Sequence, residues 1–566
     1  MNLRIVAGLL AAISVLAACG PGWAAAPTLS RVFPPGGKRG SSVIVNCTGE
    51  FSWPAMVWAP GIAVIPQAES GRLLLLIPDD LVTDRVWIRL YNAEGASATV
   101  PFLIGSLSEV VEQEPNNTIP QAQAQLQEHS AVTLNGVLQE SGDVDGCSMR
   151  LHAGQTLVAA LEANGRLGSP MDAVIQIASS DGIVVAENHD DVGLDPRAAF
   201  TAPVDGIWTA RVFAFPSAPD TNIGFRGGAD YVYRLTLTTG PVITHTIPSV
   251  TSLENPGTVE VAGWNITPGT RLQVQRPGGP YLSAYEEREL TGDQRNSAES
   301  HVGIAFNPDF PDSARVRMVP HPVQPELIQA TPPTSVSLLP PTALTGWLSQ
   351  PRQSDLYRLP LQKDQVVVIA VESRGLNLPL HPVVRLTAPD GTAAAAAEPA
   401  EPQDVVLVHT ATQNGDYQLS VTDRYRLGGD RCLYRLSVRL EEADFEISAP
   451  ADVLVIPHDK PAELELTVQR RTAPGGTPGA VTITVPDLPP GVTASTVVSE
   501  PGTPTADKVK LVFSAGGAAF SGPIHIAGTA DIRPGVRRFA RTPGRFGVCH
   551  EYLWLTALAA PQSPKP

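Results

Sequence analysis

The sequence predicts an all-β protein, a string of β-sandwich domains that follows an N-terminal signal segment. The chain has 566 residues, which is too long for one core when a domain holds roughly 100–200 residues. Its 54 Pro and 49 Gly residues interrupt nearly every window of about ten residues, so long amphipathic helical patterns are absent. Hydrophobic residues make up 43% of the chain, enough for real cores. Many short strands joined by turns satisfy all three observations.

The charge of the chain excludes one class of partner. The formal net charge is −16, and the sequence contains no run of basic residues. Proteins that bind nucleic acid neutralise phosphates with clustered Lys and Arg side chains. We therefore expect no nucleic-acid partner.

Residues 1–26 read as a leader for export. Arg4 supplies a positive charge, and residues 5–18 form an apolar stretch that is too short to span a bilayer. Leu16-Ala17-Ala18-Cys19-Gly20 resembles a bacterial lipobox, which implies that Cys19 is acylated and anchors the chain to a membrane. The alternative is ordinary signal-peptidase cleavage near Gly22-Trp23-Ala24, which gives a secreted protein. No later apolar run reaches the roughly 18 residues of a transmembrane helix.

The other cysteines do not form a framework. Cys47, Cys147, Cys432 and Cys549 are far apart and fall in different predicted domains. A disulfide scaffold needs pairs within one small fold, and zinc sites need closely spaced Cys and His residues. We expect buried free thiols.

Residues 27–105 form the first predicted β-sandwich. Strand patterns at residues 42–46, 73–77 and 86–90 are separated by turn residues. The opening Phe33-Pro34-Pro35-Gly36-Gly37-Lys38-Arg39-Gly40 resembles the start of IPT/TIG immunoglobulin-like modules. The resemblance implies an immunoglobulin-like sandwich.

Residues 106–240 contain an ordered series of short motifs. In chain order these are Glu112-Gln113-Glu114-Pro115-Asn116-Asn117-Thr118, Gly142-Asp143-Val144-Asp145, Asp181-Gly182, Val204-Asp205-Gly206-Ile207-Trp208 and Tyr231-Val232-Tyr233-Arg234-Leu235. The series resembles the bacterial pre-peptidase C-terminal (PPC) domain, a jelly-roll β-sandwich that is often appended to secreted proteases. The combination of motifs is typical of large exported proteins of planctomycete type.

An internal repeat supports this reading from the sequence alone. Gly136 and Asp145 recur, at the same spacing from one another, as Gly346 and Asp355. Tyr233-Arg234-Leu235 likewise recurs as Tyr434-Arg435-Leu436, and small changes of offset correspond to loop insertions in a shared fold. We call residues 106–240 the first repeat and residues 341–442 the second repeat, a diverged PPC-like copy.

The remaining segments complete the predicted string. Residues 241–340 contain strand patterns and end in a Pro-rich linker, which predicts another small β-sandwich. Residues 443–558 alternate well, for example over residues 463–468, and resemble a C-terminal immunoglobulin-like module. Residues 559–566 are expected to be a disordered tail.

The acidic residues of the first repeat are the best candidate for chemistry. Glu112, Glu114 and Asn116 alternate on a short linker, and Asp143 and Asp145 lie in a turn. Calcium takes six to eight oxygen ligands, which such residues supply when they converge. The linker resembles that of related collagen-binding domains of clostridial collagenases, where these residues hold calcium, so the resemblance implies a Ca²⁺ site here. The alternative is a solvated linker beside a plain Gly-Asp turn.

Two further acidic segments are expected to hold no metal ion. The second repeat keeps Asp355 but lacks the acidic linker, so we predict no calcium there. Asn188-His189-Asp190-Asp191 with Asp195 allows a second cation site or a loop turn. The turn is favoured because Asn and Asp side chains bond to nearby backbone groups.

The sequence contains no convincing catalytic motif. Gly-x-Ser-x-Gly, Ser-x-x-Lys with its partners, a Cys with a plausible His and His-Glu-x-x-His are all missing from suitable contexts. We therefore expect a non-catalytic exported protein of the cell envelope whose modules bind or scaffold an extracellular polymer or a partner protein. The alternative is an accessory or degenerate relative of a secreted protease or hydrolase whose catalytic domain is absent.

Overall fold

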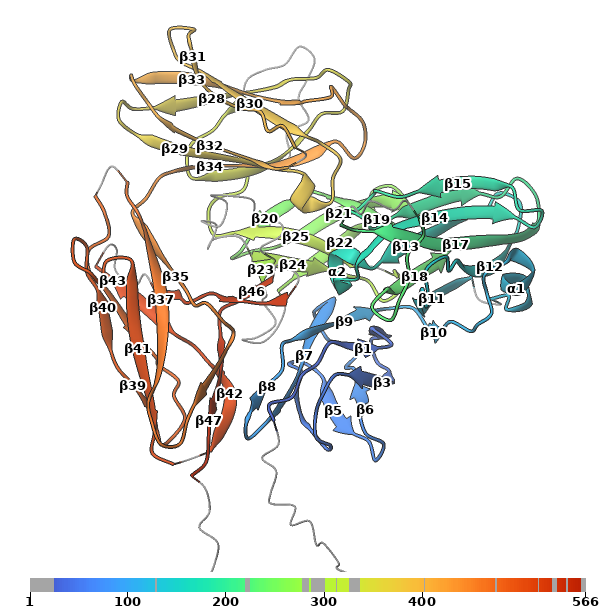
Figure 1. The fold of residues 1–566 in the computed structure, drawn as a ribbon. Coiled ribbons are helices and arrows are strands. Elements are labelled where there is room, and N and C mark those ends of the chain that lie inside the picture. Colours follow the sequence, from blue (N-terminus) through green and yellow to red (C-terminus); the bar gives the residue numbers. More distant parts are fainter. Residues whose placement is uncertain are drawn as a thin grey trace, which may run out of the picture.

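A computed structural model describes residues 25–127, 130–218, 224–276, 285–286, 301–311, 313–324, 336–401, 403–473, 476–517, 519–531, 537–545 and 548–560. Cys19 and the rest of the leader up to residue 24 lie outside these residues. The described chain is a string of β-sandwiches with two short α-helices, as the sequence predicts for the fold class (Figure 1). Among the described residues, no helix combines the length and the apolar character of a membrane span.

The N-terminal sandwich packs two sheets face to face. One sheet has the order β1-β3-β6-β5 and the other the order β2-β9-β7-β4, with β8 paired to β7. Val45, Leu73, Val86 and Phe102 are fully buried between them. The strands are β1 (Arg31–Phe33), β2 (Gly36–Lys38), β3 (Ser42–Thr48), β4 (Met56–Trp58), β5 (Ala63–Pro66), β6 (Arg72–Leu76), β7 (Arg85–Asn92), β8 (Gly95–Ala96) and β9 (Val100–Gly105).

The first repeat is a second sandwich, with sheets β10-β11-β18-β13-β16 and β12-β17-β14-β15. The short helix α1 covers β12, and its residue Ala122 is fully buried. The elements are β10 (Glu109–Val111), α1 (Ile119–Ala124), β11 (Ala131–Val137), β12 (Asp145–Leu151), β13 (Thr156–Glu162), α2 (Asn164–Leu167), β14 (Met171–Ser179), β15 (Val184–Asn188), β16 (Arg197–Thr201), β17 (Gly206–Pro216) and β18 (Val232–Thr238).

The middle domain is one six-stranded sheet around its own core. The order is β19-β21-β22-β24-β25-β20, and Val259, Val261 and Val316 are buried in it. A further short strand, β23, pairs with β46 of the C-terminal domain. The strands are β19 (Val242–Ile247), β20 (Val250–Ser252), β21 (Thr258–Trp264), β22 (Arg271–Gln275), β23 (Tyr285–Glu286), β24 (His301–Ala305) and β25 (Ala314–Val319).

The second repeat has the strand pairing of the first in both sheets, β27-β34-β29-β32 and β28-β33-β30-β31. The entering strand differs: β26 adds in parallel to β28, whereas β10 of the first repeat adds in parallel to β11. The elements are β26 (Val336–Ser337), β27 (Thr342–Trp347), β28 (Asp355–Leu361), β29 (Val366–Glu372), the 3₁₀ turn Arg374–Leu376, β30 (Pro382–Thr387), β31 (Ala393–Ala397), β32 (Val405–Thr410), β33 (Gly415–Asp423) and β34 (Leu433–Leu440).

The C-terminal sandwich has sheets β35-β37-β41-β39, β36-β47-β42 and β40-β38-β43-β44. In β37, Leu464 and Leu466 are buried while Glu463 and Glu465 are exposed, which is the alternation the sequence shows. The strands are β35 (Asp444–Ser448), β36 (Val453–Ile456), β37 (Ala462–Arg471), β38 (Val481–Thr484), β39 (Val492–Ala494), β40 (Val497–Ser499), β41 (Lys508–Ala515), β42 (Phe520–Ile524), β43 (Ala527–Ala530), β44 (Arg537–Phe539), β45 (Thr542–Pro543), β46 (Val548–His550) and β47 (Leu553–Ala557).

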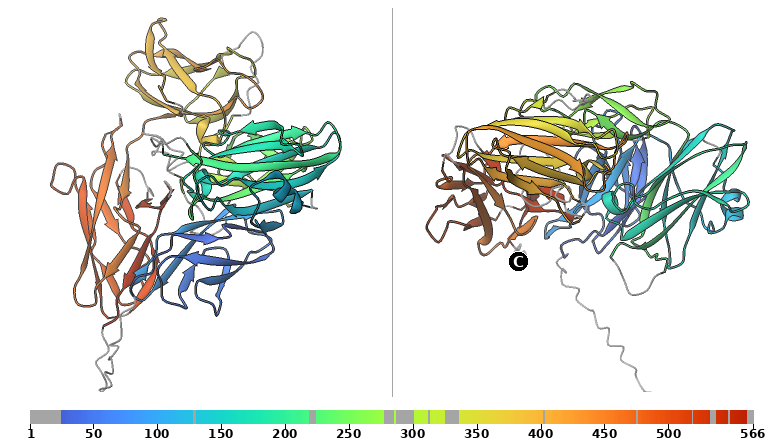
Figure 2. Two further views of the ribbon diagram at one scale, coloured as in Figure 1. Left: turned by 45° about the vertical axis from the view of Figure 1, so that its right-hand side comes forward. Right: turned by 90° about the horizontal axis from the view of Figure 1, so that it is seen from above.

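The five domains are packed against one another rather than extended. The C-terminal sandwich lies beside the N-terminal sandwich, and the second repeat lies at the top of the molecule (Figures 1 and 2). The terminal domains meet at Arg89, which is fully buried, forms an ion pair with Asp452 and lies over the ring of Trp554. Tyr91 and Trp58 also contact Trp554, at centroid distances of 4.9 and 5.6 Å. This contact joins segments that are far apart in the sequence.

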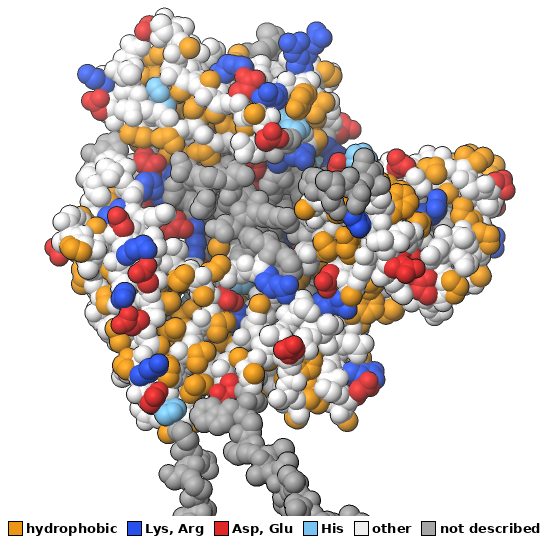
Figure 3. All heavy atoms as spheres, viewed as in Figure 1, with side chains coloured by type: hydrophobic (Ala, Val, Ile, Leu, Met, Phe, Trp, Pro, Cys, Tyr) orange, Lys and Arg blue, Asp and Glu red, His pale blue; other side chains and the backbone are white. Residues whose placement is uncertain are grey.

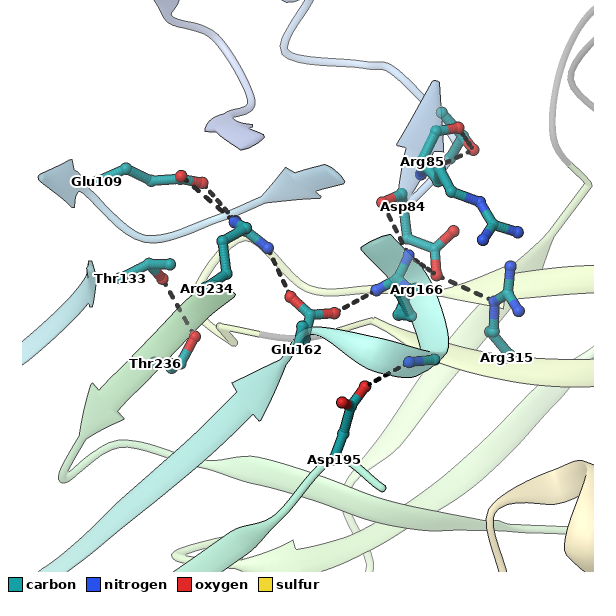
Figure 4. Close-up of polar contacts among 12 residues, drawn as sticks. Asp84, Arg85, Glu109, Thr133, Glu162, Arg166, Asp195, Arg234, Thr236 and Arg315 are labelled. Carbon is teal, nitrogen blue, oxygen red and sulfur yellow. Dashed lines mark hydrogen bonds and ion pairs between the residues drawn. The ribbon is translucent and has the colours of Figure 1, made fainter. Parts of the chain in front are cut away.

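A buried ionic cluster joins three domains (Figure 4). Asp84 of the N-terminal sandwich binds Arg166 of the first repeat at 2.9 Å and Arg315 of the middle domain at 3.1 Å. The arginines hold the pKa of Asp84 well below its usual range despite its burial. Because separating the domains would leave the buried Asp84 without its two arginine partners, the cluster opposes such separation.

Candidate metal centre

The predicted acidic residues lie at one corner of the first repeat, where the linker passes the turn before β12. Strand β10 pairs with β11, and Glu112, directly after β10, donates its backbone N–H to the Asn135 carbonyl at 3.0 Å. Asn116 then accepts a hydrogen bond from the backbone N–H of Gly146 in β12. A Cβ atom at Gly146 would lie 2.9 Å from the Asn116 carbonyl oxygen, so this close approach of linker and strand requires glycine.

Three carboxylates converge at this corner. One oxygen each from Glu114, Asp143 and Asp145 lies within 4.8 Å of the others. Oxygens bound to one Ca²⁺ ion at 2.3–2.6 Å can be at most about 5 Å apart, so this spacing fits a shared ion. Asp143 and Asp145 are 4% and 2% exposed, whereas Glu114 is exposed and leaves the corner open to solvent.

The backbone fixes two of these carboxylates. Asp143 accepts hydrogen bonds from the backbone N–H groups of Gln139 at 2.6 Å and Val144 at 3.0 Å. Glu114 accepts one from the backbone N–H of Asn116 at 3.0 Å. Little side-chain entropy would therefore be lost when an ion binds.

Glu112 and Asp145 face the same phenol. The hydroxyl of the fully buried Tyr233 lies 2.8 Å from Glu112 Oε2 and 2.7 Å from Asp145 Oδ2. A phenol has one proton and can donate it to only one carboxylate at a time. Burial, followed by the mutual repulsion of the two groups, raises the pKa of Asp145 well above its usual range, and burial also raises the pKa of Glu112. Without a cation, the pair therefore retains a proton.

Two buried oxygens at the corner lack hydrogen-bond partners: Asp145 Oδ1 and Asn116 Oδ1. Asn116 is 1% exposed and Asp145 2%. A buried oxygen without a partner costs roughly 1–3 kcal/mol, and each such atom calls for an explanation. Carboxylate and amide oxygens are the ligands that calcium takes, so the residues present fit a Ca²⁺ ion held by Glu114, Asp143 and Asp145.

The same corner of the second repeat satisfies its aspartate without an ion. Asp355 Oδ1 accepts a hydrogen bond from Gln353 Nε2 at 2.8 Å, and Asp355 Oδ2 accepts one from the Tyr434 hydroxyl at 2.6 Å. The Tyr357 hydroxyl lies 2.6 Å from that of Tyr434, so a chain of two phenols leads to one carboxylate. Gln353 occupies the position of Asp143 in the shared turn.

The acidic loop at residues 188–195 has other partners. Asp191 pairs with Arg197 and, at 2.6 Å, with Arg431 of the second repeat. Asp195 is buried and accepts the backbone N–H groups of Asn164 at 2.7 Å and Gly165 at 3.0 Å. Asp191 thus forms an interdomain contact, and Asp195 binds the backbone at the start of α2, neither of which the turn interpretation predicted.

Some functional side chains could not be recognised from the sequence. Tyr233 reaches the corner only because β18 pairs with β11 so that Tyr233 lies opposite Gly136. A Cβ atom at Gly136 would lie 2.2 Å from Tyr233 Cζ, and one at Gly346 would lie 2.2 Å from Tyr434 Cζ. The glycine and the tyrosine of each repeat thus pack directly against each other. The recurrence of both residues in the two repeats is the sequence signal that could have indicated this contact.

Comparison with known proteins assigns no family. No protein-family model and no curated protein match the chain. The PPC resemblance therefore stays a prediction.

Solved structures match the chain only at very low identity and low TM-score. The insect immune protein hemolin is 10% identical and covers 94% of this chain and 100% of its own, with a TM-score of 0.21. The M60 catalytic domain with two CBM51 domains of Clostridium perfringens ZmpB is 9% identical and covers 74% of this chain and 55% of its own, with a TM-score of 0.14. The BSP domain of a biofilm-associated protein is 10% identical and covers 95% and 97%, with a TM-score of 0.15. At such TM-scores these likenesses carry no argument about function.

Proposed function

We propose that this chain is a non-catalytic, exported scaffold of the cell envelope that binds an extracellular polymer or a partner protein through its β-sandwiches. In this proposal, a calcium ion bound at the first repeat fixes the linker that connects the N-terminal sandwich with the first repeat. The observation that carries the proposal is the corner itself, where three carboxylates lie within 4.8 Å of one another and a buried carboxylate oxygen lacks a partner. Ligands from both the linker and β12 would join two parts of the chain when the ion binds.

The packing of the domains supports a scaffold. Asp84, Arg166 and Arg315 hold three domains together, and Arg89 with Asp452 joins the terminal ones. Interfaces built on buried ion pairs fix geometry because separating the partners leaves uncompensated charges. Binding surfaces on different sandwiches then keep constant relative positions.

The thiols give no support to nucleophilic chemistry. Burial raises the pKa of Cys47 and Cys147 to about 12 and that of Cys432 to about 11. The thiolate is the nucleophilic form of cysteine, and at neutral pH these groups stay protonated. Cys147, Cys432 and Cys549 are buried and Cys47 is partly buried, which suits packing residues.

Calcium titration of the full chain tests the site. We expect saturable binding, monitored by calorimetry after chelator treatment, and slower hydrogen exchange in β10 and β12. At about 100 times the dissociation constant, calcium should stabilise the first repeat by roughly 2.7 kcal/mol. Asp145→Asn should abolish binding, and the matched variant Asp355→Asn should leave it unchanged. Hydrogen exchange that is identical in calcium and in chelator would show that the corner is a charged linker beside a turn.

Two further measurements test location and binding. Incorporation of labelled palmitate in a bacterial host, abolished by Cys19→Ala, would support the lipid anchor, whereas release of a chain that begins near Ala25 would support plain secretion. Co-sedimentation of the full chain with isolated envelope material should retain the protein. Release of soluble fragments from that material would instead favour the hydrolase-related alternative.

A further inference from the structure

Two arginines of the second repeat have a backbone conformation that arginine rarely adopts. Arg352 has φ +68° and Arg426 has φ +62°. The other non-glycine residues with positive φ among the described residues are Asn265, Asp364 and Asn377. Asn and Asp tolerate this region, whereas in arginine the Cβ atom crowds the following carbonyl oxygen without a local side-chain hydrogen bond to offset it. Residues in this conformation cluster at ligand-binding and switch regions, which directs attention to this turn.

The first repeat shows what this turn requires. The backbone N–H of Gly142 donates to the Phe225 carbonyl at 3.2 Å, and that of Arg352 donates to the Arg426 carbonyl at 3.2 Å. The two turns therefore share this backbone hydrogen bond. Gly142 has φ +94°, so the first repeat fills the strained position with glycine. The second repeat carries arginine at both of the bonded positions.

The turn that presents Arg426 is fixed by a buried carboxylate. Asp423 is 5% exposed and accepts the backbone N–H groups of His381 at 2.7 Å, Tyr425 at 2.8 Å and Leu427 at 2.9 Å. A Cβ atom at Gly428 would lie 2.1 Å from the carbonyl carbon of Gln350, so the loop packs tightly on the turn that bears Arg352. The arginines are therefore presented from rigid backbone.

The side chains at this corner are available to a ligand. Arg352 and Arg426 are exposed, and neither has an ion-pair partner among the described residues. Tyr425, which precedes Arg426, is 58% exposed, and its ring meets His381 edge-on at 4.9 Å. The uppermost domain in Figure 3, which is the second repeat, carries several basic side chains on the face shown.

Among the described residues, no acidic group forms an ion pair with either of the two arginines. The carboxylate of Asp423 is occupied by its three backbone donors. Glu398 pairs with Arg385 at 2.9 Å and Arg424 at 4.0 Å. Asp430 is exposed at the end of the loop. Because the whole chain has a net charge of −16, attraction of an anion must come from such a local group of cations.

We propose that the corner formed by Arg352, Tyr425 and Arg426 binds an acidic polysaccharide. The guanidinium groups pair with carboxylate or sulfate groups, and the exposed face of Tyr425 stacks on a sugar ring. This inference rests on the proposed binding function and names the ligand class for one domain. The corresponding corners of the two repeats then bind opposite charges, a cation in the first and an anion in the second.

Binding of the full chain to defined polymers tests the assignment. The probes are polygalacturonate for carboxylate and dextran sulfate for sulfate, with neutral dextran as the uncharged control. The variant Arg352→Gly with Arg426→Gly removes both guanidinium groups and places a residue that tolerates positive φ at each position. One or both acidic probes should bind the wild type. For such a probe, we expect the variant to have about tenfold lower affinity, as the loss of two exposed ion pairs implies. Added salt should weaken wild-type binding more than variant binding.

The variant Tyr425→Ala separates a polysaccharide from an acidic protein. We expect it to lower the affinity for the acidic polysaccharide between about two- and tenfold, the range for one aromatic contact. Its affinity for poly-glutamate should not change. Poly-glutamate that binds wild type as tightly as both polysaccharides would overturn the assignment to sugar.

Three results show whether the polysaccharide assignment holds, separately from the proposed binding function. Binding of neither acidic probe, while the chain still sediments with envelope material, would overturn this inference and leave the proposed function in place. Equal binding by wild type and the double variant would show that the acidic polymer binds elsewhere and would also overturn it. A tenfold loss in the double variant, with its hydrogen exchange unchanged at β28 and β33, would support it.

Discussion

The two repeats are built alike and differ at one corner. In the first, Asp145 faces Glu112, Glu114 and Asp143, and its Oδ1 has no partner. In the second, the equivalent Asp355 accepts hydrogen bonds from the side-chain amide of Gln353 and from the hydroxyl of Tyr434. The exchange of Asp143 for Gln353 replaces a carboxylate beside the aspartate with an amide that donates a hydrogen bond to it.

The difference begins where the linker enters. Strand β10 pairs with β11 and so brings Glu112 beside Tyr233, whereas β26 pairs with β28 on the other sheet. Tyr357 then supplies the hydroxyl next to Tyr434 in the second repeat. A shared fold can thus keep a buried aspartate with either an acidic or a neutral set of neighbours. The change at the corner follows the change of the entering strand.

The largest effect should come from a feature that both repeats share. Glu162 pairs with Arg234 at 2.6 Å, and Glu372 pairs with Arg435 at 2.7 Å and with Arg317 of the middle domain at 2.6 Å. Glu372→Ala leaves two buried guanidinium groups without this carboxylate and should lower the local free energy of unfolding by about 3–5 kcal/mol. Native-state hydrogen exchange of β29 and β34 measures the loss.

Glu162→Ala is the matched control for this effect. Its side chain is 25% exposed, against 1% for Glu372, so solvent compensates part of the loss. We expect a smaller destabilisation in β13 and β18. An effect of less than about 1 kcal/mol for Glu372→Ala would mean that the shared pair does not stabilise the repeats.

Exchanging the corner residues tests the comparison directly. In Asp143→Gln, the new amide is expected to donate to Asp145 Oδ1, raise the stability of the calcium-free first repeat by about 1–2 kcal/mol and abolish its calcium response. In Gln353→Asp, Asp355 loses its amide donor and gains a negative neighbour, which should cost about 1–3 kcal/mol. Chemical denaturation followed by hydrogen exchange, with and without calcium, reports both changes. A calcium response that survives Asp143→Gln would break the comparison.

The fold class could be predicted, but parts of the site could not. Alternation such as Leu464 and Leu466 between exposed glutamates depends only on the two-residue period of a strand, and the structure confirms it. The convergence of Glu114 with the Asp143 turn was implied by the family resemblance and not by local spacing, and calcium binding there stays a prediction. The role of Tyr233 depends on strand register, and the contact of Arg315 with Asp84 on domain packing. Neither is encoded in local residue patterns.

Acidity should affect the two corners differently. Burial raises the pKa of Glu112 and Asp145 above their unfolded values, so their stabilising contribution is present below about pH 4 and is lost as the pH rises through the folded values. In chelator, the free energy of unfolding of the first repeat should therefore fall by up to about 1.4 kcal/mol per pH unit for each proton released. Calcium binds the deprotonated carboxylates, so its affinity should rise over the same range.

The second repeat is the internal control for this pH dependence. Burial also raises the pKa of Asp355, while bonds from Tyr434 and Gln353 lower it. Its stability should therefore fall less with pH, and calcium should not change the slope. Hydrogen exchange of β12 and β28 at pH 5, 6.5 and 8 compares the two in one sample. Parallel slopes in chelator would contradict the proton shared at the first corner.

The smallest effect concerns the strained turn. Gly142 and Arg352 occupy equivalent positions with φ +94° and +68°, and the space around Gly142 is open within 4 Å of a Cβ atom. Gly142→Ala should therefore lower stability only through backbone strain, by about 1 kcal/mol. Arg352→Gly relieves that strain but adds freedom to the unfolded chain, so a gain of up to about 1 kcal/mol is expected. Denaturation midpoints at constant m-value measure both changes. If Arg352→Gly instead destabilised the second repeat, the arginine would contribute to folding, and its conformation would no longer point to a ligand.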